Sequence, residues 1–376
     1  MKIGFDAKRF FSNFTGLGNY SRFVIRALSE YAPENNYFLF TPRLKSHPEL
    51  NSILSRENIK IVIPPPAYSF FGLTSIWRTW GISKSAHTKD LEVYHGLSQE
   101  LPVNLPATVK KIVTVHDLIF IRYPQLYKSI DAAIYRTKVQ AACRQADRII
   151  AISRQTKDDI VHFLKTDPRK IEVVYQGCHP NFKKRVATEM KTSIKLKYKL
   201  PQKYILTVGT IEERKNVVLL VKALALLPVD LRMHILIIGR PTAFKKRIIE
   251  QAMQLRVSQW ILFVHDVSFT DLPAIYQGAE VFVYPSLFEG FGIPVVEALE
   301  SAVPVIAGSG SCLSEAGGAS ALYVNPENER ELADHITRVL SDVSLREQMI
   351  ATGLTHTAKF EPDIIARQLV DIYKNV

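Results

Sequence analysis

Short runs of β-branched and aromatic residues alternate with amphipathic helical segments along this chain, and no other feature constrains its fold as strongly. Strands that alternate with helices favour a parallel sheet covered by helices. In the first half, helical patterns at residues 19–31 and 131–146 lie between strand-like runs. The expected strands are residues 2–5, 37–40, 59–63, 93–95, 111–115 and 148–152.

A second series of the same kind follows residues 173–180. Its expected strands are residues 204–208, 234–238, 261–264, 281–284, 304–307 and 321–324. Its expected helices are residues 217–227, 245–255, 272–277, 294–301 and 329–340. Because 376 residues exceed what one hydrophobic core supports, we predict an α/β protein. It should have two doubly wound, Rossmann-like parallel-sheet domains that face each other across a cleft.

The lack of long apolar runs, the early charges and the few cysteines favour an enzyme that stays in the cytoplasm. No apolar run reaches the roughly eighteen residues that span a membrane, and the charges of Lys2 and Asp6 come too early for a secretory signal. The three cysteines, Cys143, Cys178 and Cys312, are far apart in the sequence. Neither a disulfide framework nor a zinc site is therefore indicated.

Positive charge is concentrated in the first half. The formal net charge is +12, and residues 1–182 hold 25 Lys and Arg against 15 Asp and Glu. Such an excess attracts nucleic acid, anionic headgroups or a diphosphate-bearing acceptor. Residues 68–80 add aromatic side chains and Arg78, a mixture that suits peripheral contact with an anionic membrane. An α-helix that fills the core or lines an acceptor cleft is the favoured interpretation of that stretch.

The segment from Pro285 to Leu299 carries the strongest functional signal. A buried strand ends at Pro285, and the turn Gly290-Phe291-Gly292 leads to Pro294, which is tolerated in a first helical turn. The free N–H groups of such a helix end attract anions, above all phosphate. Two carboxylates, Glu289 and Glu297, flank the turn and can accept hydrogen bonds from hydroxyl groups. The segment therefore suits a polyol phosphate, whereas either glutamate alone would fit a solvated charge or a helix-dipole partner.

Arg214 and Lys215 come shortly after the expected strand 204–208 and just before a helix. Ligands of open α/β sheets bind at the carboxyl ends of parallel strands, so these two cations can neutralise a diphosphate there. By themselves they would equally fit a charged helix start.

Two further patterns lie in the first half. The loop with Gly16 and Gly18 precedes a helix, but it lacks the third glycine of a dinucleotide fingerprint and starts about ten residues beyond the strand. His116 stands at the end of a strand, where a lone histidine is more often structural than catalytic. The adjacent Asp117 could orient the histidine or cap the next turn.

The string Glu-Gly-Phe-Gly-x-Pro-x-x-Glu from Glu289 to Glu297 resembles the signature of family 4 glycosyltransferases, which are retaining enzymes with the GT-B fold. Their Arg-Lys-Asn segment matches Arg214 to Asn216, although Thr210 stands where many members have arginine. The Thr-Gly-x-Gly loop and the His-Asp-Leu string of the first half are similar to family segments as well. The resemblance thus covers nearly the whole chain.

The resemblance implies a role for each of these residues. Catalytic residues would be His116, Arg214, Lys215 and Glu289, with His116 contacting the donor sugar and the two cations the leaving diphosphate. Donor-binding residues would be Gly16, Gly18, Gly290, Phe291, Gly292, Glu297 and Asp266. Within that set, Glu297 would bind the ribose, Glu289 and the Gly290–Gly292 amides the sugar, and the loop at Asp266 the base.

The resemblance also implies the division of the chain. Residues 1–178 would form an acceptor-side domain, residues 179–357 the nucleotide-sugar domain, and residues 358–376 a helix that returns to the first domain. Since no Asp-x-Asp triplet occurs, we expect no bound metal and no cofactor besides the donor.

The function expected is transfer of a hexose, mannose in the first instance, from a GDP- or UDP-sugar to a glycan or lipid-linked acceptor in cell-surface polysaccharide synthesis. Nucleic acid is not an expected partner. A sugar-nucleotide epimerase on the same fold would differ by needing no acceptor. A nicotinamide oxidoreductase lacks its glycine fingerprint, and a non-catalytic basic binding protein would leave Glu289 and Glu297 without a role.

Overall fold

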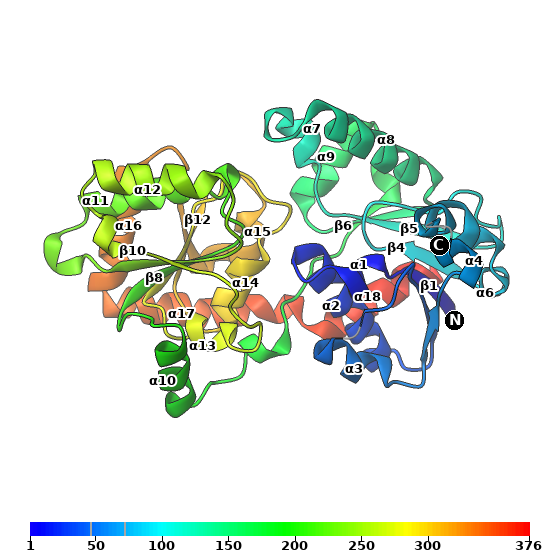
Figure 1. The fold of residues 1–376 in the computed structure, drawn as a ribbon, viewed down its shortest axis with the longest axis horizontal. Helices are drawn as coiled ribbons and strands as arrows, with labels where there is room; N and C mark the ends of the chain where they lie inside the picture. Colours follow the sequence, from blue (N-terminus) through cyan, green and yellow to red (C-terminus); the bar gives the residue numbers. More distant parts are fainter. Residues whose placement is uncertain (46, 71–72) are drawn as a thin grey trace. The chain divides into compact units, whose positions relative to one another are not determined.

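The computed structural model describes residues 1–45, 47–70 and 73–376, and it divides into two compact units (Figure 1). Unit 1 comprises Met1–Gly177 and Phe360–Val376, and unit 2 comprises Cys178–Lys359. Each unit contains one sheet whose paired strands are all parallel. The prediction of two doubly wound α/β sheets is confirmed.

The sheet of unit 1 has the strand order β3-β2-β1-β4-β5-β6-β7. Its strands are β1 (Lys2–Asp6), β2 (Asn36–Phe40), β3 (Ile59–Val62), β4 (Val93–Gly96), β5 (Lys110–Val115), β6 (Arg148–Ala151) and β7 (Ile171–Val173). The register pairs Phe5 of β1 with Leu39 of β2 and with His95 of β4. The short edge strand β7 was not anticipated.

Helices pack against this sheet and connect its strands. They are α1 (Lys8–Ser12), α2 (Gly16–Tyr31), α3 (Pro48–Leu54), α4 (Pro66–Phe70), α5 (Thr74–Ile76), α6 (Ala86–Lys89), α7 (Ile119–Arg122), α8 (Ser129–Gln145), α9 (Arg154–Leu164) and α18 (Pro362–Lys374). The last of these, drawn in red in Figure 1, packs against α2 within unit 1. Ser153 caps α9, because its hydroxyl accepts a hydrogen bond from the Thr156 N–H at 3.0 Å.

The aromatic stretch at residues 68–80 is not one continuous helix. It runs through the end of α4, α5 and a π-helical turn at Trp77–Gly81, while residues 71 and 72 lie outside the described residues. Trp77 is buried, and Arg78 pairs with the buried Asp6 at 2.6 Å. Ile76 and Trp80 remain exposed. The stretch therefore contributes to the core through Trp77, and Arg78 is occupied by an internal ion pair.

The sheet of unit 2 has the order β10-β9-β8-β11-β12-β13. Its strands are β8 (Tyr204–Val208), β9 (His234–Ile238), β10 (Ile261–Val264), β11 (Val281–Tyr284), β12 (Val305–Gly308) and β13 (Ala321–Val324). Its helices are α10 (Thr188–Lys197), α11 (Val217–Leu226), α12 (Phe244–Gln254), α13 (Leu272–Tyr276), α14 (Ile293–Glu300), α15 (Leu313–Gly317), α16 (Glu329–Ser341) and α17 (Val343–Thr357). The helices α10, α15 and α17 were not anticipated.

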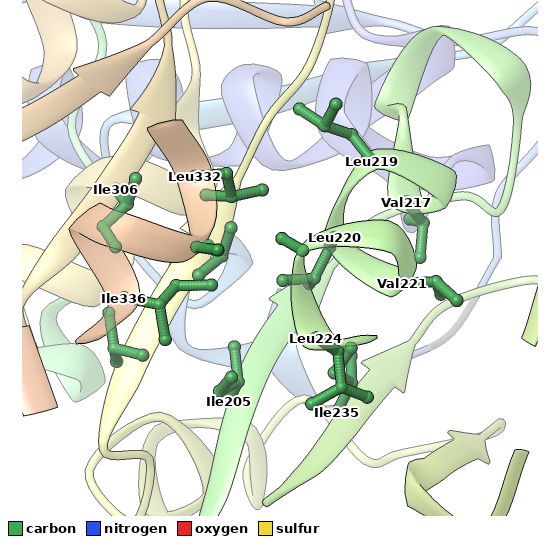
Figure 2. Packing of buried hydrophobic residues seen from close by; sticks show 14 of the residues in the cluster. Ile205, Val217, Leu219, Leu220, Val221, Leu224, Ile235, Ile306, Leu332 and Ile336 are labelled. Carbon is green, nitrogen blue, oxygen red and sulfur yellow. The ribbon is translucent and has the colours of Figure 1, made fainter. Parts of the chain in front are cut away.

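The core of unit 2 anchors the strands that carry the functional loops. Figure 2 shows Leu224 of α11 next to Ile235 of β9, and Leu220, Ile205, Leu332 and Ile336 belong to the same buried cluster. Each of these side chains is fully buried, and burial of one such side chain contributes about 1.5–3 kcal/mol. The strand ends of β8 and β11 are thereby held at fixed positions.

The order of strands identifies one edge of each sheet as a binding edge. In unit 2 the chain runs from β8 outward to β10 and then returns to β11 on the other side of β8. In unit 1 it runs from β1 outward to β3 and returns to β4 on the other side of β1. Ligands of open α/β sheets bind outside the carboxyl ends of the strands where the direction reverses. These points lie between β8 and β11 and between β1 and β4.

Candidate functional site

Two cations and one carboxylate meet at the point where the strand order of unit 2 reverses. Arg214 and Lys215 follow β8 in a short turn, and Glu289 lies in the loop after β11. The Arg214 Nη1 atom lies 2.7 Å from Oε2 of Glu289, and Lys215 Nζ lies 2.7 Å from Oε1. We call these three side chains the charge cluster. Two motifs that are 74 residues apart in sequence thus form one site.

Backbone contacts hold the loop after β11 against the turn that carries the cations. The Leu287 N–H donates a hydrogen bond to the Arg214 carbonyl at 2.9 Å. Asn216, which has a left-handed φ of +55°, donates from its amide to the carbonyls of Pro285 at 3.2 Å and Pro326 at 2.7 Å. Asparagine tolerates this conformation better than most residues. Asn216 therefore holds the β8 and β11 loops together, a structural role that the sequence did not reveal.

The charge cluster is buried, and its charges stabilise one another. Burial opposes ionisation of Glu289, but the positive charges of Lys215 and Arg214 outweigh this effect and lower the pKa of the carboxyl to about 2. Burial lowers the pKa of Lys215, partly offset by Glu289, and Lys215 also donates to the Tyr284 hydroxyl. Burial likewise opposes the charge of Arg214, but Glu289 raises its pKa. The site thus holds ionised groups in a poorly solvated position, where they interact strongly with any incoming charge.

The glycine turn is shaped by its surroundings as well as by its own backbone. Gly292 has φ of +106°, and a Cβ atom placed there would lie 2.5 Å from a terminal carbon of Leu313. The Phe291 ring is buried, so this residue can reach a ligand only through its backbone. Helix α14 begins right after Gly292 and has Pro294 in its first turn, as expected. The Val295 N–H at this helix start donates a hydrogen bond to the Gly292 carbonyl at 2.9 Å.

Glu297 lies in a different environment from Glu289. Its carboxylate accepts a hydrogen bond from the Tyr276 hydroxyl at 2.9 Å, within the unit 2 interior. Burial raises the pKa of Glu297 to about 7, although the Tyr276 hydrogen bond acts in the opposite direction. The structure therefore joins Glu289 to the two cations and gives Glu297 a neutral partner.

Asp266 lies beyond the carboxyl end of β10, at the same sheet edge as the charge cluster but two strand positions from β8. Its side chain is exposed and its φ is +56°, a left-handed conformation that aspartate tolerates better than most residues.

His116 of unit 1 is buried at the end of β5. Its Nε2 atom lies 2.8 Å from the Leu97 carbonyl, so Nε2 carries a proton, and its ring packs edge-on against Tyr20. Burial lowers the pKa of His116 to about 4, which makes the imidazole neutral at physiological pH. Asp117 accepts the Ile119 N–H at 3.1 Å, so it caps the next turn.

The two glycines of the unit 1 loop differ in the space that surrounds them. A Cβ atom at Gly18 would lie 1.6 Å from the Asn13 carbonyl oxygen, so packing against the end of α1 requires glycine. At Gly16, the first residue of α2, a Cβ atom would meet no described atom within 4 Å. Steric contact inside the protein therefore explains Gly18 but leaves Gly16 open for close approach by a ligand.

Sequence reasoning also missed a buried hydrogen-bond network in unit 1. His95 connects the Tyr373 hydroxyl of α18, at 2.7 Å, to the Thr114 hydroxyl, at 2.8 Å. Thr114 in turn lies 3.0 Å from the Tyr20 hydroxyl, and Tyr20 packs on His116. A polar residue inside a strand pattern was the available signal, but its partner on α18 lies 278 residues away.

Among residues 1–45, 47–70 and 73–376, no group of three or more His, Cys, Asp and Glu side chains is arranged to hold a metal ion. In the same part of the chain, no helix is both long enough and apolar enough to cross a membrane.

Comparison with protein families gives two matches that together cover most of the chain. The family model described as Glycosyltransferase Family 4 matches residues 16–182. The model described as Glycosyl transferases group 1 matches residues 190–356.

Individual proteins are similar along much of the chain. O-antigen chain mannosyltransferase B of Escherichia coli is 29% identical over 75% of this chain and 74% of its own length. O-antigen chain mannosyltransferase RfbU of Salmonella typhimurium is 28% identical over 62% of each chain, so less than two thirds of that relative is matched. Among solved structures, Anabaena Alr3699/HepE in complex with UDP-glucose has a TM-score of 0.75 over the full length of both chains at 16% identity, which shows a common fold.

Proposed function

Because this chain belongs to the glycosyltransferases of family 4, which have the GT-B fold, we propose that it transfers a hexose from a nucleotide-sugar donor to a glycan acceptor with retention of anomeric configuration. The observation that carries this proposal is the charge cluster at the reversal point of the unit 2 sheet. It combines cations for a diphosphate with a carboxylate for sugar hydroxyls.

In the proposed mechanism the protein stabilises the departing phosphate. As the bond between the anomeric carbon and the phosphate oxygen breaks, negative charge grows on that oxygen, and Arg214 and Lys215 are positioned to neutralise it. The first-turn amides of α14 add the positive end of the helix dipole. The acceptor hydroxyl attacks from the same face, and its proton passes to the departing phosphate oxygen. No protein nucleophile is required by this scheme.

Glu289 has two tasks in this scheme. Ionised at all working pH values, it holds the two cations in place and accepts hydrogen bonds from the donor sugar. Glu297 accepts the ribose hydroxyls, and the loop at Asp266 receives the base. Within unit 1, His116 and the loop with Gly16 and Gly18 are the residues proposed to contact substrate.

We propose a GDP-mannose donor first and a UDP-hexose second, in polysaccharide synthesis on the cytoplasmic side of the membrane. The names of the two O-antigen mannosyltransferases support mannose and a polysaccharide product. The HepE complex with UDP-glucose supports a nucleotide-sugar ligand and leaves the base open. The exposed Ile76 and Trp80 support peripheral membrane contact, whereas the paired Arg78 argues against a charge contribution from that residue.

The test is a screen of GDP-mannose, UDP-glucose and UDP-galactose by thermal stabilisation, followed by nucleotide release in the presence of glycan acceptors. A donor that binds the folded state raises the melting temperature. We expect one nucleotide sugar to stabilise the wild-type protein and Arg214→Ala to lose that stabilisation. The proposal is wrong if no donor changes the melting temperature and no nucleotide is released.

Metal independence is a separate proposal, since cations of the protein take the place of a divalent ion at the diphosphate. We expect full transfer activity after dialysis against excess EDTA. A strict need for Mg²⁺ or Mn²⁺ would contradict it.

A further inference from the structure

Unit 1 contains a cavity at the point where its own strand order reverses. The cavity has a volume of about 260 Å³. Its wall includes Arg9, which follows β1, the loop Ser98 to Glu100, which follows β4, and Asp117, which follows β5. These strands are neighbours in the sheet. We call this cavity the unit 1 pocket.

The loop after β4 is held in a conformation that costs free energy. Gln99 has φ of +62°, which is uncommon for a residue with a side chain. A Cβ atom at Gly96 would lie 2.1 Å from the Glu100 carbonyl oxygen, so the chain folds back tightly there. Gln99 is fixed by its N–H on the Thr114 carbonyl at 2.9 Å and by its amide on the Asp117 carbonyl at 3.0 Å. Strain that is maintained by specific contacts clusters at binding sites.

One wall of the unit 1 pocket is aromatic. The Phe120 ring centroid lies 6.4 Å from that of Tyr127 and 5.8 Å from that of Tyr135. Phe120 is buried beneath, whereas Tyr135 on α8 is 48% exposed. An exposed ring on a buried aromatic base offers a flat apolar surface with a polar rim. Such a surface suits a ligand that has one apolar face and many hydroxyl groups.

Charge around the unit 1 pocket is balanced. Its ionisable lining consists of the cations Arg9 and Lys138 and the carboxylates Glu100 and Asp117. Lys138 lies 3.1 Å from Glu100, which also pairs with Arg78 behind it. A wall with two charges of each sign supplies hydrogen-bond donors and acceptors without attracting an anion. The charge cluster of unit 2 also has a second carboxylate beside it, since Arg214 pairs with Glu212 at 2.7 Å.

From these features we infer that the unit 1 pocket binds one sugar ring of a neutral glycan acceptor, stacked on Tyr135. The volume is below the roughly 300–1,000 Å³ of pockets for drug-sized ligands, which accords with a single ring. The acceptor saccharide is thus recognised by a ring face and by hydroxyl groups, not by phosphate. This inference rests on the proposed transferase function.

The test compares Tyr135→Ala with the control Tyr31→Ala. Both tyrosines lie on helices of unit 1 and are 48% exposed, but Tyr31 does not line the pocket. With saturating GDP-mannose or whichever donor is active and an alkyl mannoside as acceptor, we expect Tyr135→Ala to raise the acceptor KM about tenfold. Tyr31→Ala should keep the wild-type acceptor KM. Tyr135→Phe keeps the ring and should stay within about twofold of wild type.

Hydrolysis of the donor by the wild-type protein without acceptor reports the proposed function separately. If the wild-type protein turns over donor while Tyr135→Ala keeps the wild-type acceptor KM, the pocket assignment is wrong and the transferase proposal stands. If a mannose phosphate proves a better acceptor than the neutral mannoside, the neutral-sugar assignment is also wrong. Lack of any donor turnover by the wild-type protein would reject both.

Discussion

The turn that carries Glu289 and the helix that carries Glu297 belong to one short motif. The pKa values of the two carboxyl groups nevertheless shift in opposite directions. The two carboxylates are buried to the same degree, with 8% and 7% of the residue exposed. Two cations lower the pKa of Glu289 to about 2, whereas burial without a cation raises that of Glu297 to about 7. Burial alone therefore does not decide the charge of a motif glutamate, because its nearest partners do.

This difference suggests a division of labour. Glu289 is a permanent anion that pairs with Arg214 and Lys215, the two cations proposed to bind the diphosphate. Glu297 changes its charge close to physiological pH and gains hydrogen-bond acceptor capacity as the pH rises. Four substitutions test this contrast.

Removing the permanent anion should have the largest effect. Glu289→Ala leaves two largely buried cations without their shared partner, although Arg214 keeps Glu212 at 2.7 Å, and loss of one member of a buried ion pair costs about 3–5 kcal/mol. We expect a loss of that size in the free energy of unfolding measured with urea. The control Glu213→Ala removes an exposed partner of Arg247 and should change stability by less than about 1 kcal/mol. Equal losses for the two variants would show that the charge cluster is not effectively buried.

The second-largest effect should be a loss of kcat on removal of a cation. We expect Arg214→Ala to lower kcat by about 10²–10³-fold, since a positioned charge that stabilises the departing phosphate is lost. The matched control is Arg247→Ala, an exposed arginine of the same unit whose side chain is 64% exposed. Steady-state kinetics with saturating donor measure the effect. A kcat within threefold of wild type would remove Arg214 from the proposed mechanism.

The proton on Glu297 should appear in the pH dependence of stability. A carboxyl whose pKa rises from 4.5 to about 7 on folding binds its proton more tightly in the folded state. Its contribution is fully present below pH 4.5 and is lost as the pH rises through 7. Glu297→Gln should therefore gain about 3 kcal/mol relative to wild type between pH 4 and pH 8, as an upper bound.

Urea unfolding at each pH measures this difference, and Glu213→Gln provides an exposed control. Parallel stability curves for wild type and Glu297→Gln would show that Glu297 titrates in its ordinary range. The donor KM should also fall between pH 6 and pH 8 if ionised Glu297 binds the ribose.

The turn between the two glutamates should give the smallest effect. Gly292→Ala places a side chain at φ of +106° and 2.5 Å from Leu313, whereas Gly310→Ala meets a φ of +80° without a described atom within 4 Å. Both variants incur backbone strain of about 1–2 kcal/mol, but only the first adds a steric contact. We expect Gly292→Ala to be less stable by about 1 kcal/mol more, measured by thermal unfolding. Equal values would assign the need for glycine to backbone conformation alone.

Much of the fold was predictable because strand-helix alternation is a local pattern. The strands at 204–208, 234–238 and 281–284 agree with the structure at both ends. The helices α10 and α17 escaped prediction because their apolar residues are spread around the helix and do not form one stripe. Strand β7 escaped because three residues are too few for a period-two pattern to show.

The sequence predicted which residues belong to the candidate site. It did not predict which of these residues contact one another. The motif named Glu289, Glu297, Arg214 and Lys215, yet nothing in it distinguishes a glutamate that pairs with cations from one that bonds to Tyr276. The His95 to Tyr373 connection and the aromatic pocket with Tyr135 were invisible for the same reason, since their partners lie far away in sequence. Spacing along the chain carries no information on such contacts.

The amino-acid sequence by itself determined two α/β domains, the members of the candidate site and the glycosyltransferase family. These depend on periodicity and on short contiguous motifs, which a linear chain records directly. Only the tertiary structure decided which carboxylate pairs with cations, which glycine is sterically required and which residues line the unit 1 pocket. Those properties arise from burial and from neighbours brought together by folding, and the free energy of a charge depends on both.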